Sequence, residues 1–196
     1  MRILVTGAKG FVGKNLCVQL NNIKEGKDKT HPELSVESVY EYDINSTLEE
    51  LDTYCRDCDF VFNLAGVNRP QNQEEFMQGN FGFASTLLDT LKKHGNRCPV
   101  MLSSSQQASL TGRFGNSEYG RSKKAGEELF WIIARRRVRQ SRFTVSRICL
   151  ASGVGPIIIV LLRLSATLVL TTYLIRLMTR RWSWNCFILM TWWMRC

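Results

Sequence analysis

The first 20 residues, MRILVTGAKGFVGKNLCVQL, contain a glycine-rich turn between a predicted strand and a predicted helix. The run Ile3–Val5 is apolar and β-prone, and from Phe11 onward apolar residues recur at helical spacing. Here Gly7 permits a sharp turn, Gly10 a close approach of backbone to phosphate, and Gly13 close packing of helix on strand. The helix N-terminus then offers N–H groups and partial positive charge, which predicts a dinucleotide pyrophosphate site. The spacing is GxxGxxG, and a glycine turn in an unrelated α/β protein is the alternative interpretation.

Strand and helix patterns alternate from this turn to residue 130. Further strands are predicted at 36–42, 59–64 and 99–102. Helices are predicted at 11–23, 46–55, 74–94 and 118–130. Ser46 and Glu49 form a predicted capping box at the second helix. Alternation with short loops predicts an α/β fold, a Rossmann-like, doubly wound parallel sheet, for residues 1–130.

Charge is distributed unevenly along the chain. The net charge is +9, yet all 17 acidic residues and all nine lysines precede residue 131. Residues 1–130 therefore carry −2, from 15 basic and 17 acidic residues, whereas residues 131–196 carry +11. Such a basic segment is typical of a nucleic-acid arm or a membrane-facing segment. The apolar stretch 155–178 is interrupted by Arg163 and Arg176, so we expect no membrane anchor.

The codons of Trp and Met suggest another origin for this tail, because each has a single codon and both end in G. Read one base earlier, the codon of Ile132 becomes Asp, that of Asn185 Glu and that of Thr191 Asp. The same frame permits R-F-P-N-L-F-G at 145–151, R-P-N-Y-N-S-A-V-A-T-F-C at 155–166 and F-Y-I-D-D-L-V-D at 187–194. The acids alone arise by chance, since G before a codon beginning with A always gives Asp or Glu. The three strings predict that residues 131–196 are an aberrant, irregular or poorly folded tail, read out of frame after Phe130.

The seven cysteines are scattered, and only Cys55 and Cys58 form a CxxC pair. A zinc site needs a second pair of ligands, so we expect no metal and a structural role for these thiols. Met1 and Arg2 run straight into a strand, which leaves no room for a signal peptide. We therefore expect a truncated cytoplasmic protein with reduced thiols.

Tyr119 and Lys123 form a YxxxK pair on a predicted helix, and a spacing of four places both side chains on one face. An ammonium group near a phenol favours the phenolate, so we expect a lowered pKa for Tyr119 and a role as general acid/base. Ser105 lies at the carboxyl end of a strand, where ligands bind in such sheets, and can bond the same substrate oxygen. Asp43 closes the second strand, where an acid binds the adenine ribose and favours NAD, although Lys9 suits the 2′-phosphate of NADP.

The motifs TGAKGFVG, FNLAG, LSSS and YGRSK, in this order, resemble the extended short-chain dehydrogenase/reductases, the NAD-dependent epimerase/dehydratase family. LAGVNRP at 64–70 and the shifted-frame strings are most similar to the UDP-sugar reductases of capsular polysaccharide synthesis. Those reductases act in making UDP-N-acetyl-L-fucosamine and carry a C-terminal zinc cupin domain, of which this chain has no counterpart. Only one strand fits between the first helix and FNLAG, where larger members have two.

The resemblance implies catalytic residues and a cofactor site. The catalytic group is Ser105, Tyr119 and Lys123. The residues implied to bind the cofactor, NAD(P) with NADH or NADPH undecided, are Gly7, Gly10, Phe11, Val12, Gly13, Asp43, Leu64, Ala65, Gly66, Asn80, Ser103, Tyr119 and Lys123.

The function predicted from this resemblance is reduction of a keto-sugar on a nucleotide, impaired in this chain because the substrate lobe comes mostly from the later half. The implied partner is a UDP-sugar, without nucleic acid or membrane, and a homodimer is compatible with an intact member. One alternative is a nucleotide-sugar 4-epimerase or dehydratase of the same family. Another is a non-catalytic dinucleotide-binding regulatory protein, which needs no YxxxK pair.

Overall fold

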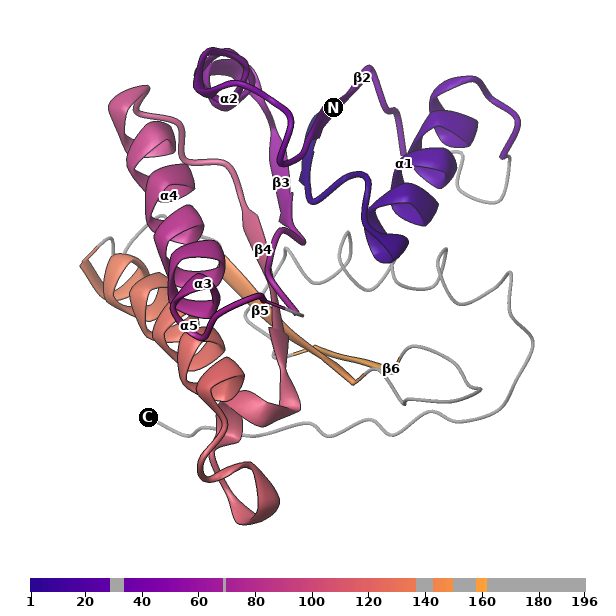
Figure 1. Cartoon of the computed structure of the whole chain (residues 1–196). Helices are drawn as coiled ribbons and strands as arrows, with labels where there is room; N and C mark the ends of the chain where they lie inside the picture. Colours follow the sequence, from indigo (N-terminus) through magenta and orange to yellow (C-terminus); the bar gives the residue numbers. More distant parts are fainter. Residues whose placement is uncertain (29–33, 69, 137–142, 150–157, 162–196) are drawn as a thin grey trace.

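A six-stranded sheet in the order β2-β1-β3-β4-β5-β6 organises the chain (Figure 1). The computed structural model describes residues 1–28, 34–68, 70–136, 143–149 and 158–161, with side chains up to residue 132. The strands are β1 (Arg2–Thr6), β2 (Ser38–Tyr42), β3 (Phe60–Asn63), β4 (Val100–Ser105), β5 (Phe143–Cys149) and β6 (Ile158–Leu161). Neighbours from β2 to β5 are parallel, and β6 is antiparallel to β5. This confirms the predicted α/β, Rossmann-like parallel sheet.

The helices follow the strands in the predicted alternation. They are α1 (Phe11–Lys24), α2 (Leu48–Asp57), α3 (Glu74–Phe76), η1 (Met77–Gly82), α4 (Phe83–Lys93) and α5 (Glu118–Arg136), with 3₁₀ turns η2 (Gln106–Ser109) and η3 (Gly112–Phe114) between β4 and α5. The predicted helix over 74–94 is thus three consecutive segments, of which the middle one, η1, is a π-helix. As expected, β2 is the one strand that the described residues form between α1 and β3.

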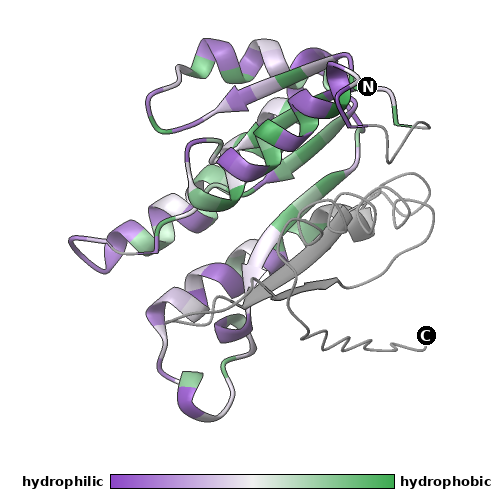
Figure 2. Cartoon of the chain, turned by 90° about the vertical axis from the view of Figure 1, so that its right-hand side faces the viewer, coloured by the Kyte–Doolittle hydropathy of each residue, from purple (hydrophilic) through white to green (hydrophobic). Residues whose placement is uncertain are grey.

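Alternate residues of the central strands face two separate cores. On β1, Ile3 and Val5 pack with α1, whereas Leu4 packs on the opposite face with α2, α4 and the second half of α5. All three side chains are fully buried, and each such side chain contributes about 2 kcal/mol to folding. Figure 1 shows α1 on one side of the sheet and α4 with α5 on the other, and Figure 2 shows the apolar colouring concentrated on the strands and inner helix faces.

The N-cap of the second helix lies one residue later than predicted. Its capping box is Thr47 with Glu50: the Thr47 hydroxyl accepts from the Glu50 N–H, and the Glu50 carboxylate accepts from the Thr47 N–H. The Ser46 hydroxyl instead accepts from the backbone N–H of Asp43, which closes the turn after β2. The prediction of Ser46 and Glu49 was therefore wrong, because Ser46 is engaged in the preceding turn.

Beyond residue 130 the structure describes the end of α5 and the strands β5 and β6; the rest of the tail lies outside the described residues. We expected an irregular segment, and these two strands are regular. β5 pairs with β4 from Val100↔Phe143 to Ser105↔Ile148. The sequence of β5, FTVSRIC, is rich in β-branched and aromatic residues, which favour a strand. Among the described helices, none is both long and apolar enough to cross a membrane.

Candidate active site

The turn after β1 is built on glycines that leave no space for a side chain. Gly7 has φ +71°, and a Cβ there would lie 2.8 Å from the backbone nitrogen of Ala65. A Cβ on Gly13 would lie 2.1 Å from the carbonyl oxygen of Gly7, so α1 rests directly on the turn. The close packing predicted from the spacing is therefore present. A larger residue at Gly7 or Gly13 would push apart β1, β3 and α1.

The first turn of α1 has the properties of an anion site. Gly10 is the N-cap and supplies no side-chain cap, and the first turn carries no acidic residue. Gly13 is buried, Val12 is half-buried, and Phe11 is 64% exposed at this end of the helix. Uncapped amides at a helix N-terminus favour a phosphate group. A dinucleotide pyrophosphate thus fits the chemistry of this turn.

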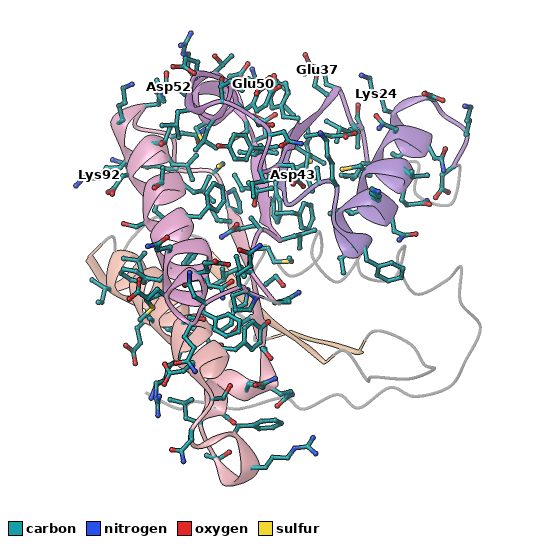
Figure 3. All side chains as sticks on the ribbon, in the orientation of Figure 1. Lys24, Glu37, Asp43, Glu50, Asp52 and Lys92 are labelled. Atoms are coloured by element: carbon teal, nitrogen blue, oxygen red, sulfur yellow. The ribbon has the colours of Figure 1, made fainter. Side chains whose placement is uncertain are left out.

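Asp43 lies directly beside the glycine turn, at the end of β2 (Figure 3). Its carboxylate accepts from the backbone N–H of Lys9 at 2.7 Å and from that of Ile44 at 2.8 Å. The backbone N–H of Ala8 also donates to the carbonyl oxygen of Tyr42 at 3.2 Å. These bonds orient the Asp43 carboxylate against the turn, which is the location predicted for an acid on the adenine ribose.

The end of β3 joins the glycine turn to the part of the site formed by η1, β4 and α5. The Thr6 hydroxyl donates to the side-chain oxygen of Asn63 at 2.7 Å, and both residues are buried. The Leu64 N–H donates to the Thr6 carbonyl oxygen at 3.1 Å, which extends β3 toward Ala65. The next residue, Gly66, is exposed.

Gly66, in the loop after β3, lies against side chains from η1 and α5. A Cβ on Gly66 would lie 2.6 Å from the side-chain oxygen of Asn80 and 2.7 Å from the Lys123 Nζ. Asn80 is buried on the π-helix η1, and such segments frequently occur at functional sites. Its amide accepts from the Val67 N–H at 3.1 Å and donates to the Ser122 hydroxyl at 2.9 Å. Asn80 therefore joins the loop after β3 to α5.

The predicted catalytic residues converge at the carboxyl end of β4. Ser105 is the last residue of β4, and its hydroxyl hydrogen-bonds Tyr119 on α5. The Lys123 Nζ lies 5.8 Å from the centre of the Tyr119 ring and donates to the Ser103 carbonyl oxygen at 3.4 Å. The ring of Phe76, on α3, lies 5.5 Å from that of Tyr119. The structure thus brings the serine, tyrosine and lysine into one site.

Burial sets the protonation of this group. Burial raises the pKa of Tyr119, and the hydrogen bond with Ser105 offsets this only in part. Burial also lowers the pKa of Lys123 to about 8. The prediction of a lowered pKa for Tyr119 is therefore wrong for this structure, because desolvation of the phenol is the largest cause and raises the pKa.

Three polar residues that support the site were missed in the sequence. Ser122 holds the Asn80 amide, and the Ser104 hydroxyl donates to the buried Glu127 carboxylate at 2.6 Å. Glu127 follows Lys123 by four residues, so helical spacing alone places it on the same face of α5. The partners of Ser104 and Ser122 come from other elements, and no local pattern indicates them.

Comparisons with known proteins identify the family and a curated relative. The family described as "NAD dependent epimerase/dehydratase family" matches residues 3–158. A curated relative, the UDP-2-acetamido-2,6-beta-L-arabino-hexul-4-ose reductase of Pseudomonas aeruginosa, is 38% identical over 133 residues, which are 68% of this chain and 32% of the relative. The chain thus spans about a third of that relative's length.

Solved structures agree on the fold. The capsular polysaccharide assembling protein CapF from Staphylococcus aureus is similar with a TM-score of 0.58 and 30% identity, covering 78% of this chain and 35% of that protein. MoeE5, solved in complex with UDP-glucose and NAD, has a TM-score of 0.55 at 22% identity, covering 74% of this chain and 52% of that protein. The second likeness concerns the fold alone.

Proposed function

Because this chain belongs to the NAD dependent epimerase/dehydratase family, we propose that it is a nucleotide-sugar oxidoreductase that uses NAD(P) to reduce a keto-sugar. The observation that carries the proposal is the convergence of Ser105, Tyr119 and Lys123 at the carboxyl end of β4. Lys123 also lies against Gly66, in the loop beside the turn that suits a pyrophosphate. The similarity to a UDP-sugar reductase and to CapF supports a UDP-sugar and the synthesis of a surface polysaccharide.

The proposed mechanism assigns one task to each residue. When bound, the nicotinamide supplies the hydride for the keto carbon of the sugar. Tyr119 gives its phenolic proton to the carbonyl oxygen, which becomes a hydroxyl. Ser105 hydrogen-bonds both Tyr119 and that oxygen, so it aligns donor and acceptor. The Lys123 ammonium stabilises the phenolate left behind, since opposite charges favour each other in a buried site.

The burial of Lys123 argues against a purely regulatory dinucleotide-binding protein. Placing an ammonium in a site that lowers its pKa to about 8 costs stability, and its position beside the Tyr119 phenol serves proton transfer, which a binding module does not perform. A 4-epimerase uses the same three residues, but it regenerates its cofactor in each turnover. Net consumption of NADH with a UDP-4-keto-sugar therefore supports the reductase, and interconversion of two UDP-sugars without net consumption contradicts it.

We propose NAD as the preferred cofactor, because Asp43 occupies the place of the ribose-binding acid. Titration of the full chain with NADH and NADPH, followed by nicotinamide fluorescence, tests binding directly. Tyr119→Phe should still bind NADH but lower turnover by about 10²-fold or more. Undiminished turnover in this variant would refute the mechanism.

We also propose that the tail is read out of frame and that turnover of this chain is impaired. The support is the absence of acids after residue 128 and the three strings in the shifted frame. Sequencing the coding DNA across codons 125–160 tests this, and the chain with the frame restored should gain turnover on the UDP-4-keto-sugar. An intact frame shared with close relatives would contradict the proposal.

A further inference from the structure

Two thiols far apart in the sequence touch at the end of the sheet opposite the proposed active site. Cys58 follows α2 directly, and Cys98 precedes β4 by two residues. Their sulfur atoms lie 3.8 Å apart, across 40 residues of sequence. β3 and β4 are neighbouring parallel strands, and the Val61 N–H donates to the Pro99 carbonyl oxygen at 3.0 Å just beyond the sulfurs. The contact therefore belongs to the framework of the sheet. Figure 1 shows the junction of α2 and β3 at the top of the view, with the β4–α5 connection at the bottom.

We propose that Cys58 and Cys98 are a modification site, at which a low-molecular-weight disulfide converts the two thiols into an intramolecular disulfide. The proposal rests on the sulfur geometry and is independent of the proposed oxidoreductase function. The CxxC pair that stands out in the sequence thus contributes one cysteine, and the partner comes from the next strand in the sheet.

The side chain of Asn96 holds the two cysteine segments together. Its amide nitrogen donates to the carbonyl oxygens of Cys55 and Cys58, each at 2.9 Å. Its amide oxygen accepts from the Cys98 N–H, also at 2.9 Å. A single side chain thus binds the end of α2 and the start of the β4 segment, which keeps the two sulfurs in contact.

The other described thiols lie in different settings. Cys17 belongs to the core beneath α1, on the other face of the sheet. Cys55 is fully buried, and burial raises its pKa to about 12. Within the part of the chain that the structure describes, no group of three or more His, Cys, Asp or Glu residues could hold a metal ion. The geometry therefore favours sulfur–sulfur chemistry over metal binding.

The exchange is balanced in two steps. The Cys98 thiolate, which lies on the more exposed of the two residues, attacks one sulfur of glutathione disulfide and releases one glutathione thiolate. The Cys58 thiolate then attacks the Cys98 sulfur of the mixed disulfide and releases the second glutathione. The protein loses two protons and two electrons, and the glutathione disulfide takes them up to become two glutathione molecules.

The reaction should be slow at neutral pH, because the thiolate is the attacking species. The hydrogen bond with Cys58, and then burial, raise the pKa of Cys98, and the nearby Cys55 and Asp59 act in the same direction. The exchange is therefore tested at mildly alkaline pH, where more thiolate is present.

The test is peptide mapping of the full chain after incubation with glutathione disulfide, acid quenching and alkylation. Trypsin cleaves after Arg56 and Arg97, so Cys55, Cys58 and Cys98 fall on three separate peptides. We expect the Cys58 and Cys98 peptides to be joined, at a mass two hydrogens below their sum. A Cys55–Cys58 link, or alkylated Cys58 and Cys98 after prolonged oxidation, would overturn the proposal.

Matched variants separate this pair from the other thiols. Cys17→Ser and Cys55→Ser should retain the joined peptides, whereas Cys98→Ser should lose them and leave Cys58 alkylated. Should Cys98→Ser fail to fold, the map of the unchanged sequence still decides. Retention of a cross-link to Cys58 in Cys98→Ser would contradict the proposed partner.

Discussion

The two halves of the candidate site are positioned by different means. The half formed by β1, α1 and β3 is shaped by backbone contacts, with Gly7 and Gly13 placed where any Cβ would collide with a neighbour. The half formed by η1, β4 and α5 is shaped by buried polar side chains, including Asn80, Lys123 and Glu127. The first half therefore depends on space, and the second depends on satisfied hydrogen bonds and desolvated charge.

This difference suggests how each half relates to stability. A glycine turn that leaves no vacant space is stabilised by close packing and needs no charged group. A lowered pKa shows that burial destabilises the ammonium form of Lys123, and such unfavourable burial is typical of functional residues. Substitutions in the first half should destabilise the fold, and the removal of Lys123 in the second half should stabilise it.

The largest effect is expected for Gly7→Ala, with Gly26→Ala as the matched control. Both glycines have a positive φ, +71° and +68°, but a Cβ on Gly26 would meet nothing within 4 Å. The control should cost about 1 kcal/mol from backbone strain alone. Gly7→Ala adds a collision with Ala65 and should cost about 3 kcal/mol in all. Urea unfolding followed by circular dichroism measures both, and equal costs would show that the close approach to β3 carries no energy.

Lys123→Met should stabilise the protein by about 2 kcal/mol at neutral pH. A shift of the Lys123 pKa from 10.5 to about 8 corresponds to a cost of about 3 kcal/mol, which the variant removes. The variant also loses the weak hydrogen bond to Ser103, which reduces this gain. Because the folded pKa is about 8, the full free-energy cost of burying the ammonium applies below pH 8. That cost disappears as the pH rises from 8 toward 10.5, because the unfolded chain then releases its proton as well. The advantage of the variant should shrink over the same range.

The control for this variant is Lys124→Met, on the exposed side of the same helix. The Lys124 Nζ lies 4.0 Å from the Glu128 carboxylate, and surface pairs of this kind contribute little. We expect a change within about 0.5 kcal/mol. A Lys123→Met variant that is less stable at every pH would contradict the contrast between the two halves.

The two halves also differ in how well the sequence predicts them. The glycine turn is a local pattern, and its strand, turn and helix all lie between Arg2 and Lys24, where the sequence places them. The second half depends on contacts between distant residues, such as Asn80 with Ser122 and Ser104 with Glu127. Periodicity predicts a helix over 74–94 but cannot indicate that its middle is a π-helix that turns Asn80 inward.

Local competition and burial explain two further differences between the predictions and the structure. Ser46 has the correct residue type for a helix cap, but its hydroxyl closes the preceding turn, so the cap falls on Thr47. The lowered pKa expected for Tyr119 followed from its spacing to Lys123. Spacing gives proximity without desolvation, and desolvation determines the direction of the change.

Asp43→Asn tests the first half of the site through cofactor binding and not through stability. Loss of the carboxylate should weaken NADH binding by about tenfold and remove the preference over NADPH, because a charged acceptor on a ribose hydroxyl contributes about 1.5 kcal/mol or more. Fluorescence titration with both dinucleotides gives the two Kd values. Glu41→Gln, two residues earlier on the exposed side of β2, should leave both unchanged. Unaltered NADH binding in Asp43→Asn would separate Asp43 from the cofactor.

The smallest expected effect concerns the hydrogen bond between Ser105 and Tyr119. That bond opposes the rise in the Tyr119 pKa caused by burial, so Ser105→Ala should raise this pKa further. The phenolate absorbance of each protein, minus that of its Tyr119→Phe counterpart, isolates the titration of this one tyrosine. Ser109→Ala, whose hydroxyl bonds Thr111 on the exposed loop, is the control and should leave the midpoint unchanged. If Ser105→Ala leaves it unchanged as well, burial alone sets the tyrosine's acidity, and the serine then serves only to align the substrate oxygen.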